Sequence, residues 1–182
     1  MFERFTGAGR SVVVEAEARA RELGSPAITP VHLLLGLLAP AAGPSREVLE
    51  AHGVRARDVL AACRPDPASA GFSDEDAGAL AALGIDLAAV LRRAEDAFGP
   101  DALAPAPRGR HGRTRFSAPS RAVMAASVRE AQRLRSGEIT SAHLLLGLLR
   151  AGDADTLALL RSLGAETAAL ESDALRTIGR AA

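Results

Sequence analysis

The sequence predicts an all-α protein in which two tandem repeats of about four helices each pack as one pseudo-twofold domain, with an extra helix and a flexible linker between them. Residues 28–37 (ITPVHLLLGL) return almost unchanged as residues 139–148 (ITSAHLLLGL). The same separation of 111 residues relates Phe5 to Phe116 and Leu49 to Leu160. Each copy spans about sixty residues, near the lower limit for an independent core, so we expect the copies to share one domain.

These repeats set the expected boundaries. We assign residues 1–64 to the first repeat, residues 65–115 to an inter-repeat helix with an arginine-rich linker, and residues 116–182 to the second repeat, all within one globular domain.

The first helix of each repeat has a capping residue and an apolar stripe. Thr6 is the expected N-cap of the first copy, and Ser117, with Pro119 in the first turn, that of the second. Apolar or small side chains then recur at helical spacing and the helix ends near Gly24 in the first copy; they are Val12, Ala16, Ala20 and Leu23, matched by Val123, Ser127, Ala131 and Leu134.

The second helix of each repeat starts at Thr29 and at Thr140 and is apolar on nearly every side, so we expect it to be central and buried. Gly36 and Gly147 lie in its interior, where glycine is unfavourable, which predicts a close helix crossing at that position.

Later helices are marked by glycine caps. A third helix is expected to end at Gly53 and at Gly164, and a fourth to cover about residues 57–63 and 166–178. Between the repeats, residues 74–98 are expected to be helical, and LGIDLAAVL resembles the junctions at the two capping glycines. Residues 99–115 are rich in Pro, Gly and Ala and predict a flexible linker.

Composition excludes several functions. The 22 basic and 22 acidic side chains balance, so no global field favours polyanions. The chain contains no lysine, which excludes a Walker A loop, and no tyrosine or tryptophan, which disfavours a base-stacking surface. Cys63 is the single cysteine and is expected to pack within a helix. Without a membrane-length apolar run or a signal-peptide pattern, the expected location is the cytoplasm.

Two features allow alternative interpretations. His32 and His143 occupy equivalent positions and could meet to bind a metal, but no ligand-type residue accompanies either one, so a structural hydrogen bond in the first turn is favoured. The linker arginines could contact phosphates or form a solvated tether; they are Arg108, Arg110, Arg113 and Arg115, beside His111.

The outer side of the first helix carries an apolar residue where solvent is expected. On a helical wheel Val14 falls opposite the buried stripe, beside Arg10 and Glu17. With Val13 at the edge and Phe2 before the cap, an exposed apolar patch with charged margins is one interpretation. In the alternative, Phe2 staples the helix start and Val14 contacts the linker helix.

Residues 1–24 (MFERFTGAGRSVVVEAEARARELG), followed by ITPVHLLLGLL, closely resemble the N-terminal domain of Clp-family unfoldases, especially of the ClpC type, and so does RFSAPSRAVMAASVREAQRLRSGEITSAHLLLGLL. In that family two Clp repeats form an all-helical platform that binds adaptors and substrates for attached ATPase rings. The resemblance therefore implies a stand-alone, non-catalytic binding module without a cofactor. It would act as an adaptor, competitor or decoy toward Clp unfoldase or protease components, their substrates or adaptors, or hydrophobic cyclic peptides.

The family comparison also implies a binding face. Matched to the family face position by position, it comprises Phe2, Arg10, Val13, Val14 and Glu17 with Phe116, Arg121 and Met124, of which Phe116 and Met124 are equally compatible with the core. The family motif GTEH has glutamates that bind phosphoarginine in some members, and Val31 and Ala142 stand at those positions, so we expect an apolar ligand instead. A nucleic-acid-associated regulator that uses the residues 108–115 is the alternative function, and an enzyme is third.

Overall fold

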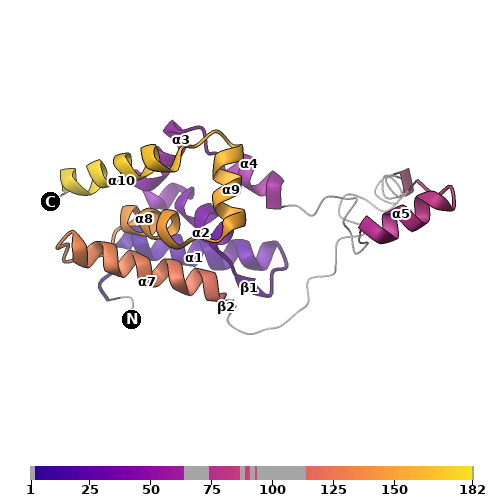
Figure 1. Cartoon of the computed structure of the whole chain (residues 1–182). Helices are drawn as coiled ribbons and strands as arrows, with labels where there is room; N and C mark the ends of the chain where they lie inside the picture. Colours follow the sequence, from indigo (N-terminus) through magenta and orange to yellow (C-terminus); the bar gives the residue numbers. More distant parts are fainter. Residues whose placement is uncertain (1–2, 64–73, 87–88, 91–92, 94–113, 182) are drawn as a thin grey trace. The chain divides into compact units, whose positions relative to one another are not determined.

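The computed structural model describes residues 3–63, 74–86, 89–90, 93 and 114–181. The chain divides into two compact units, one formed by Met1–Cys63 with His111–Ala182 and the other by Arg64–Arg110. The prediction of an all-helical protein is confirmed, because helices account for nearly all regular structure in the described part of the chain (Figure 1).

The larger unit contains both repeats, and each repeat has four α-helices in the same order. The first comprises α1 (Gly7–Glu22), β1 (Ala27–Ile28), α2 (Pro30–Leu37), the short 3-10 helix η1 (Pro40–Ala42), α3 (Pro44–Ala51) and α4 (Ala56–Cys63). The second comprises β2 (Arg115–Phe116), α7 (Ala118–Arg133), α8 (Ser141–Ala151), α9 (Ala154–Ser162) and α10 (Thr167–Ala181). In the smaller unit, α5 covers Asp74–Ala82.

The caps and stripes of the first helices are confirmed. The Thr6 hydroxyl accepts the backbone N–H of Gly9 at 3.1 Å, and the Ser117 hydroxyl accepts that of Ser120 at 3.2 Å. On the inner side of α1 and α7 the predicted stripe is buried, except for its last residue in each helix, Leu23 and Leu134, which is half-buried. Each first helix therefore packs one side on the core and leaves the other free.

Helices α2 and α8 form the centre of the core, as predicted. Every residue of Leu33–Leu38 and of Leu144–Leu148 is buried. In Figure 1 the two helices lie together in the middle of the unit, with α1 and α7 along one side. The leucine run common to both repeats is thus the shared interior of one packed unit.

Gly36 and Gly147 let the first and second helices of each repeat approach closely. A Cβ atom at Gly36 would lie 2.2 Å from the carbonyl oxygen of Val12, and one at Gly147 would lie 2.7 Å from that of Val123. Neither contact is possible for a side chain, since real Cβ atoms are not found that close to backbone oxygen. The predicted close crossing is confirmed in both repeats.

The repeats are joined by reciprocal strand pairing that the sequence did not predict. Ile28 of β1 pairs in parallel with Phe116 of β2, and Phe5 forms the equivalent bridge with Ile139. The backbone N–H of Ser117 donates to the carbonyl of Ile28 at 2.9 Å, and that of Thr6 donates to Ile139 at 3.1 Å. Each repeat therefore supplies the residues before its first helix to the other repeat. In Figure 1, α1 runs toward β1 and α7 runs back from the paired β2, so the two helices are antiparallel.

Two glycines reverse the chain after α3 and α9, as the sequence indicated. Gly53 has φ +80° and Gly164 has φ +82°, a conformation that glycine adopts without steric cost. The fourth helices begin at Ala56 and Thr167, close to the expected positions, and α10 extends to Ala181.

The inter-repeat segment differs from a continuous helix over 74–98. Helix α5 ends at Ala82, because Gly84 adopts φ +77° and breaks the helix. The chain becomes helical again at 89–90, as the predicted likeness to the Gly53 and Gly164 junctions implies. The predicted linker over 99–113 lies outside the described residues.

We predict that Gly36→Ala destabilises the protein by about 1 to 3 kcal/mol, because the new methyl group forces α1 away from α2. Gly179→Ala is the matched control, since a Cβ atom at this α10 position meets nothing within 4 Å. The control should leave stability unchanged or raise it by up to about 1 kcal/mol through helix propensity. Urea denaturation measures both variants, and equal effects would contradict the close crossing.

Candidate functional site

The outer side of α1 presents an apolar residue to solvent. Val14 is 67% exposed, while Val12 and Ala16, on the opposite side of the same helix, are fully buried. Val13 is half-buried at the edge between the two sides. The prediction that Val14 faces outward is confirmed, and such an exposed branched side chain on a well-packed helix is a candidate contact residue.

A surface depression of about 670 Å³ lies beside Val14. One wall comes from α1 and the other from the turn after α2; the lining residues are Gly7, Arg10, Ser11, Val14, Glu15, Ala39, Pro40 and Ala41. The second wall could not be predicted from the repeat, because Ala39–Ala41 lie outside the repeated motif. The proline that ends the leucine run was the available signal, since it forces the chain into η1 beside α1.

Charged side chains flank Val14 in fixed positions. The Arg10 guanidinium donates to the carbonyl of Phe5 at 2.6 Å. One turn after Val14, Glu17 accepts from Arg21 at 2.6 Å, and Glu15 pairs with Arg19 at 2.7 Å. These ion pairs lie at the edges of the apolar patch and leave Val14 uncovered. Their net contribution to stability is small because their side chains are at least partly exposed.

The second repeat carries the corresponding residues on α7. Arg121 repeats the contact of Arg10, donating to the carbonyl of Phe116 at 2.7 Å. Phe116 and Met124 are half-buried and pack against the core. Because α1 and α7 run antiparallel, the helix starts that carry Arg10 and Arg121 lie at opposite ends of the pair. Of the predicted set, Arg10 and Val13 on α1 have equivalents on α7, which are Arg121 and Met124. Phe116 lies in β2 at the position equivalent to Phe5, and Phe2 lies outside the described residues.

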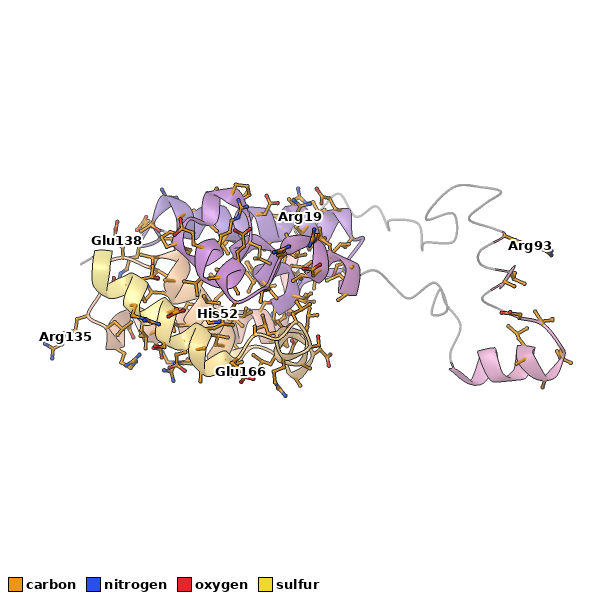
Figure 2. The ribbon with its side chains drawn as sticks, turned by 90° about the horizontal axis from the view of Figure 1, so that it is seen from above. Arg19, His52, Arg93, Arg135, Glu138 and Glu166 are labelled. Atoms are coloured by element: carbon orange, nitrogen blue, oxygen red, sulfur yellow. The ribbon has the colours of Figure 1, made fainter. Side chains whose placement is uncertain are left out.

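The positions of the family glutamates hold apolar side chains in packed surroundings. Val31 is half-buried against the core and Ala142 is 2% exposed. Ala142 borders a second depression of about 520 Å³, which also includes Thr140, Ser141 and the turn after α7. Arg135 and Glu138 extend from that turn (Figure 2). Neither Val31 nor Ala142 can supply a carboxylate to a guanidinium group.

His32 and His143 are structural, as favoured from the sequence. The Nδ1 atom of His32 accepts the backbone N–H of Thr29 at 3.0 Å, and that of His143 accepts the backbone N–H of Thr140 at 3.1 Å. Each ring completes the capping box at the start of its helix. In the described part of the chain, no group of three or more His, Cys, Asp or Glu side chains is arranged to hold a metal ion.

Burial disfavours the protonated form of both histidine rings. It lowers the pKa of His32 below the ordinary 6.5. The pKa of His143 is lowered for the same reason, although the nearby Glu130 carboxylate opposes the shift. The Nε2 atom of His143 is buried and has no hydrogen-bond partner among the described residues, so a proton added there would be poorly solvated.

Three polar contacts not predicted from the sequence tie the later helices to the unit. His52, at the end of α3, lies beside the yellow α10 in Figure 2, where its Nε2 atom is 2.8 Å from the Asp173 carboxylate. The hydrogen bond from His52 is the largest of the effects that lower the pKa of Asp173. In the second repeat, buried Glu130 pairs with Arg150 at 2.8 Å, and Arg150 reaches Glu171 at 2.6 Å.

The remaining predictions concern Cys63, the linker arginines and membrane-spanning helices. Cys63 packs against the core at the end of α4, as expected, and burial raises the pKa of its thiol, which disfavours the reactive thiolate. Of the linker arginines only Arg115 lies within the described residues, in β2. Across the described residues no helix is both long and apolar enough to cross a membrane.

Comparison with known families shows to which family the two repeats belong. The family described as the Clp repeat (R) N-terminal domain matches residues 4–97, 70–163 and 115–182. The chain belongs to the Clp repeat N-terminal domain family. The resemblance inferred from the repeated motif is thereby confirmed, and so is the two-repeat architecture.

Known Clp proteins align with nearly the whole chain. The chloroplastic chaperone protein ClpD2 of Oryza sativa subsp. japonica is 30% identical over 98% of this chain, and the chloroplastic ClpC2 of the same plant is 29% identical over 98%. Both alignments cover 16% of the relative, so this chain spans about a sixth of the length of the proteins it matches.

Solved structures share the fold. The N-terminal domain of ClpD from Arabidopsis thaliana superposes with a TM-score of 0.57 at 22% identity, covering 98% of this chain and 97% of that one. The Hsp104 N-terminal domain from Candida albicans gives a TM-score of 0.64 at 14% identity, covering 97% and 93%. At these identities the structural likeness concerns the fold alone.

The two capping histidines predict a pH dependence. Because their pKa values are lower in the folded protein, the unfolded chain binds protons that the folded chain does not, so stability should fall as pH drops below about 6.5. The double variant His32→Gln with His143→Gln keeps an acceptor in each capping box but does not titrate, so its stability should vary less with pH.

Urea denaturation between about pH 7.5 and about pH 5 measures this difference in slope. At the upper end, where both rings are neutral, wild type and variant should differ by no more than about 1 kcal/mol. An identical slope for the two proteins would show that these rings do not set the pH dependence.

Proposed function

We propose that this Clp repeat domain binds segments of other proteins through the outer side of α1, without catalysis. Its ligands would be substrates or adaptors of a Clp-type unfoldase, or hydrophobic peptides, including cyclic ones. The observation that carries the proposal is the 67% exposure of Val14 beside a lined depression, on a helix whose other side is buried in the core.

The chemistry of this face favours an apolar segment with polar edges. Val14 and the small residues Ala39–Ala41 offer an apolar surface, and backbone is exposed at Gly7. Arg10 borders the depression with its guanidinium already held by the Phe5 carbonyl, so little side-chain entropy is lost when a ligand contacts it. Full burial of one valine side chain contributes roughly 1.5 to 3 kcal/mol to binding.

The other predicted residues fit the same proposal in two roles. Val13 and Glu17 extend the α1 face along the helix. The second group consists of Phe116 in β2 with Arg121 and Met124 on α7. Its two partly buried side chains, Phe116 and Met124, support the surface, and Arg121 is exposed. We propose the α1 group as the primary contact, because α7 has Ala125 at the position of Val14.

On this proposal the ligand is not phosphoarginine. Recognition of a guanidinium group needs a carboxylate partner, and both family positions are apolar here. An apolar segment requires no such partner, so the substitution of Val31 and Ala142 supports the apolar class.

Added to a separate ATPase ring, the domain would influence Clp proteolysis through competition or delivery. As a decoy or competitor it would occupy segments that the unfoldase domain otherwise binds, and as an adaptor it would bring them to the ring. Degradation of a model substrate by a reconstituted ClpC-type protease distinguishes these roles. Added domain slows degradation in the first case and accelerates it in the second.

We predict that Val14→Glu weakens partner binding by roughly tenfold or more while leaving the fold intact, because it places a charge on the apolar patch. Ala168→Glu is the matched control, since it adds the same charge at an exposed position of α10. Pull-downs from native cell extract, washed at high salt, should recover Clp components or their substrates with wild type and control only.

Two results would contradict the proposal. One is equal recovery of the same partners by Val14→Glu. The other is recovery of nucleic-acid-binding proteins that are lost in the salt wash, which would instead support phosphate contacts by the linker arginines. Circular dichroism should show the same helix content for all three proteins.

A further inference from the structure

The segment between the repeats contains a third copy of the junction between the last two helices of a repeat. Residues 80–91 (LAALGIDLAAVL) align without gaps with residues 49–60 (LEAHGVRARDVL) and 160–171 (LRSLGAETAALE). All three begin with leucine, have glycine at the fifth position and an aliphatic residue at the sixth and eleventh. The pattern is that of an end of α3 and a start of α4.

The backbone geometry of the three junctions is the same. The backbone N–H of Ile85 donates to the Leu80 carbonyl at 2.9 Å; the equivalent bonds, from Val54 to Leu49 and from Ala165 to Leu160, are 3.0 Å each. Gly84 has φ +77°, against +80° and +82° for the glycines of the complete repeats. Val90 begins the next helix by donating to Asp86 at 3.0 Å, as Val59 and Leu170 donate to their counterparts.

The family matches include this segment. Residues 70–97 fall within two matches of the Clp repeat family, at the end of 4–97 and at the start of 70–163. The sequence and backbone pattern of residues 80–90 correspond to the second half of a Clp repeat, and the ten residues between Cys63 and α5 are too few for an α1–α2 pair.

The missing pair leaves apolar side chains exposed. In the complete repeats the leucine, the aliphatic residue after glycine and the aliphatic residue of the next helix are all 0–1% exposed; they are Leu49, Val54 and Val59, and Leu160, Ala165 and Leu170. In the third copy Ile85 is 41% and Val90 50% exposed, and neighbouring Leu83 is 76% exposed. Side chains that form core elsewhere in this chain thus face solvent here.

The complete repeats show what kind of surface covers these positions. There, α4 packs on the leucine-rich α2, and α10 packs on the leucine-rich α8. Charge adds a second criterion, because residues 74–96 carry six carboxylates against the two arginines Arg92 and Arg93, a net charge of −4. A second copy of the same face would bring like charges together and is disfavoured.

We infer that Ile85 and Val90, with Leu83, form a docking surface for an amphipathic helix of another protein that has leucines on one side and basic residues at its margins. The inference does not depend on the proposed role of Val14, which lies in the other unit. The leucine side would take the place of the missing α2, and the basic margins would face the acidic segment.

The test uses the full-length chain and a fluorescein-labelled model peptide of about 18 residues, with leucines at helical spacing and arginines elsewhere. Ile85→Asp with Val90→Asp removes the apolar surface but makes the segment more acidic. Ala81→Asp with Ala82→Asp adds the same charge at exposed positions of the segment and keeps the apolar side chains. Fluorescence anisotropy measures the affinity of each protein.

We expect wild type to bind, the Ala81/Ala82 variant to bind at least as tightly, and the Ile85/Val90 variant to bind at least about tenfold more weakly. In a Val14→Glu background, which removes the α1 face, Ile85→Asp with Val90→Asp should cause the same loss of affinity, which separates this surface from the α1 face. Absence of binding by wild type would overturn the inference, as would undiminished binding by the Ile85/Val90 variant. Concentration-dependent dimerisation that only this variant abolishes would also overturn it, in favour of a second copy.

Discussion

The close contact between the first and second helix of each repeat is the constraint on which the remaining structure depends. A side chain at Gly36 or Gly147 would overlap backbone oxygen of the preceding helix, so the two helices can pack at this distance only with glycine. This contact buries one side of α1 and of α7 completely and places the leucines of α2 and α8 in a common core. The histidine caps then satisfy the backbone where the buried helices begin.

Reciprocal strand pairing turns two such helix pairs into a single unit. Because Phe5 pairs with Ile139 and Phe116 with Ile28, each repeat is anchored by residues of the other. This pairing fixes the starts of both first helices. There Arg10 donates a hydrogen bond to the carbonyl of Phe5, and Arg121 donates one to the carbonyl of Phe116. The outer side of α1 does not pack on the core, so Val14 is exposed, as the proposed binding face requires.

Much of this arrangement could be predicted from the sequence because the repeat supplies two independent examples of each feature. The buried second helix, the glycine crossing, the histidine caps and the outward position of Val14 all follow from local pattern. The strand exchange did not, because Ala27–Ile28 and Arg115–Phe116 are too short to show an alternating pattern. The wall formed by Ala39–Ala41 was missed for a different reason, since only tertiary packing brings it beside α1.

Because the residues before each first helix pair with the other repeat, the two repeats should unfold together. Native-state hydrogen exchange of the intact chain is the most direct test, because it reports the free energy of opening for single amides. Amides of Leu34 in α2 and Leu145 in α8 should exchange with the same free energy of opening, within about 0.5 kcal/mol, and respond equally to added urea. Opening energies that differ by several kcal/mol would show that each repeat is an independent folding unit and that the strand exchange does not couple them.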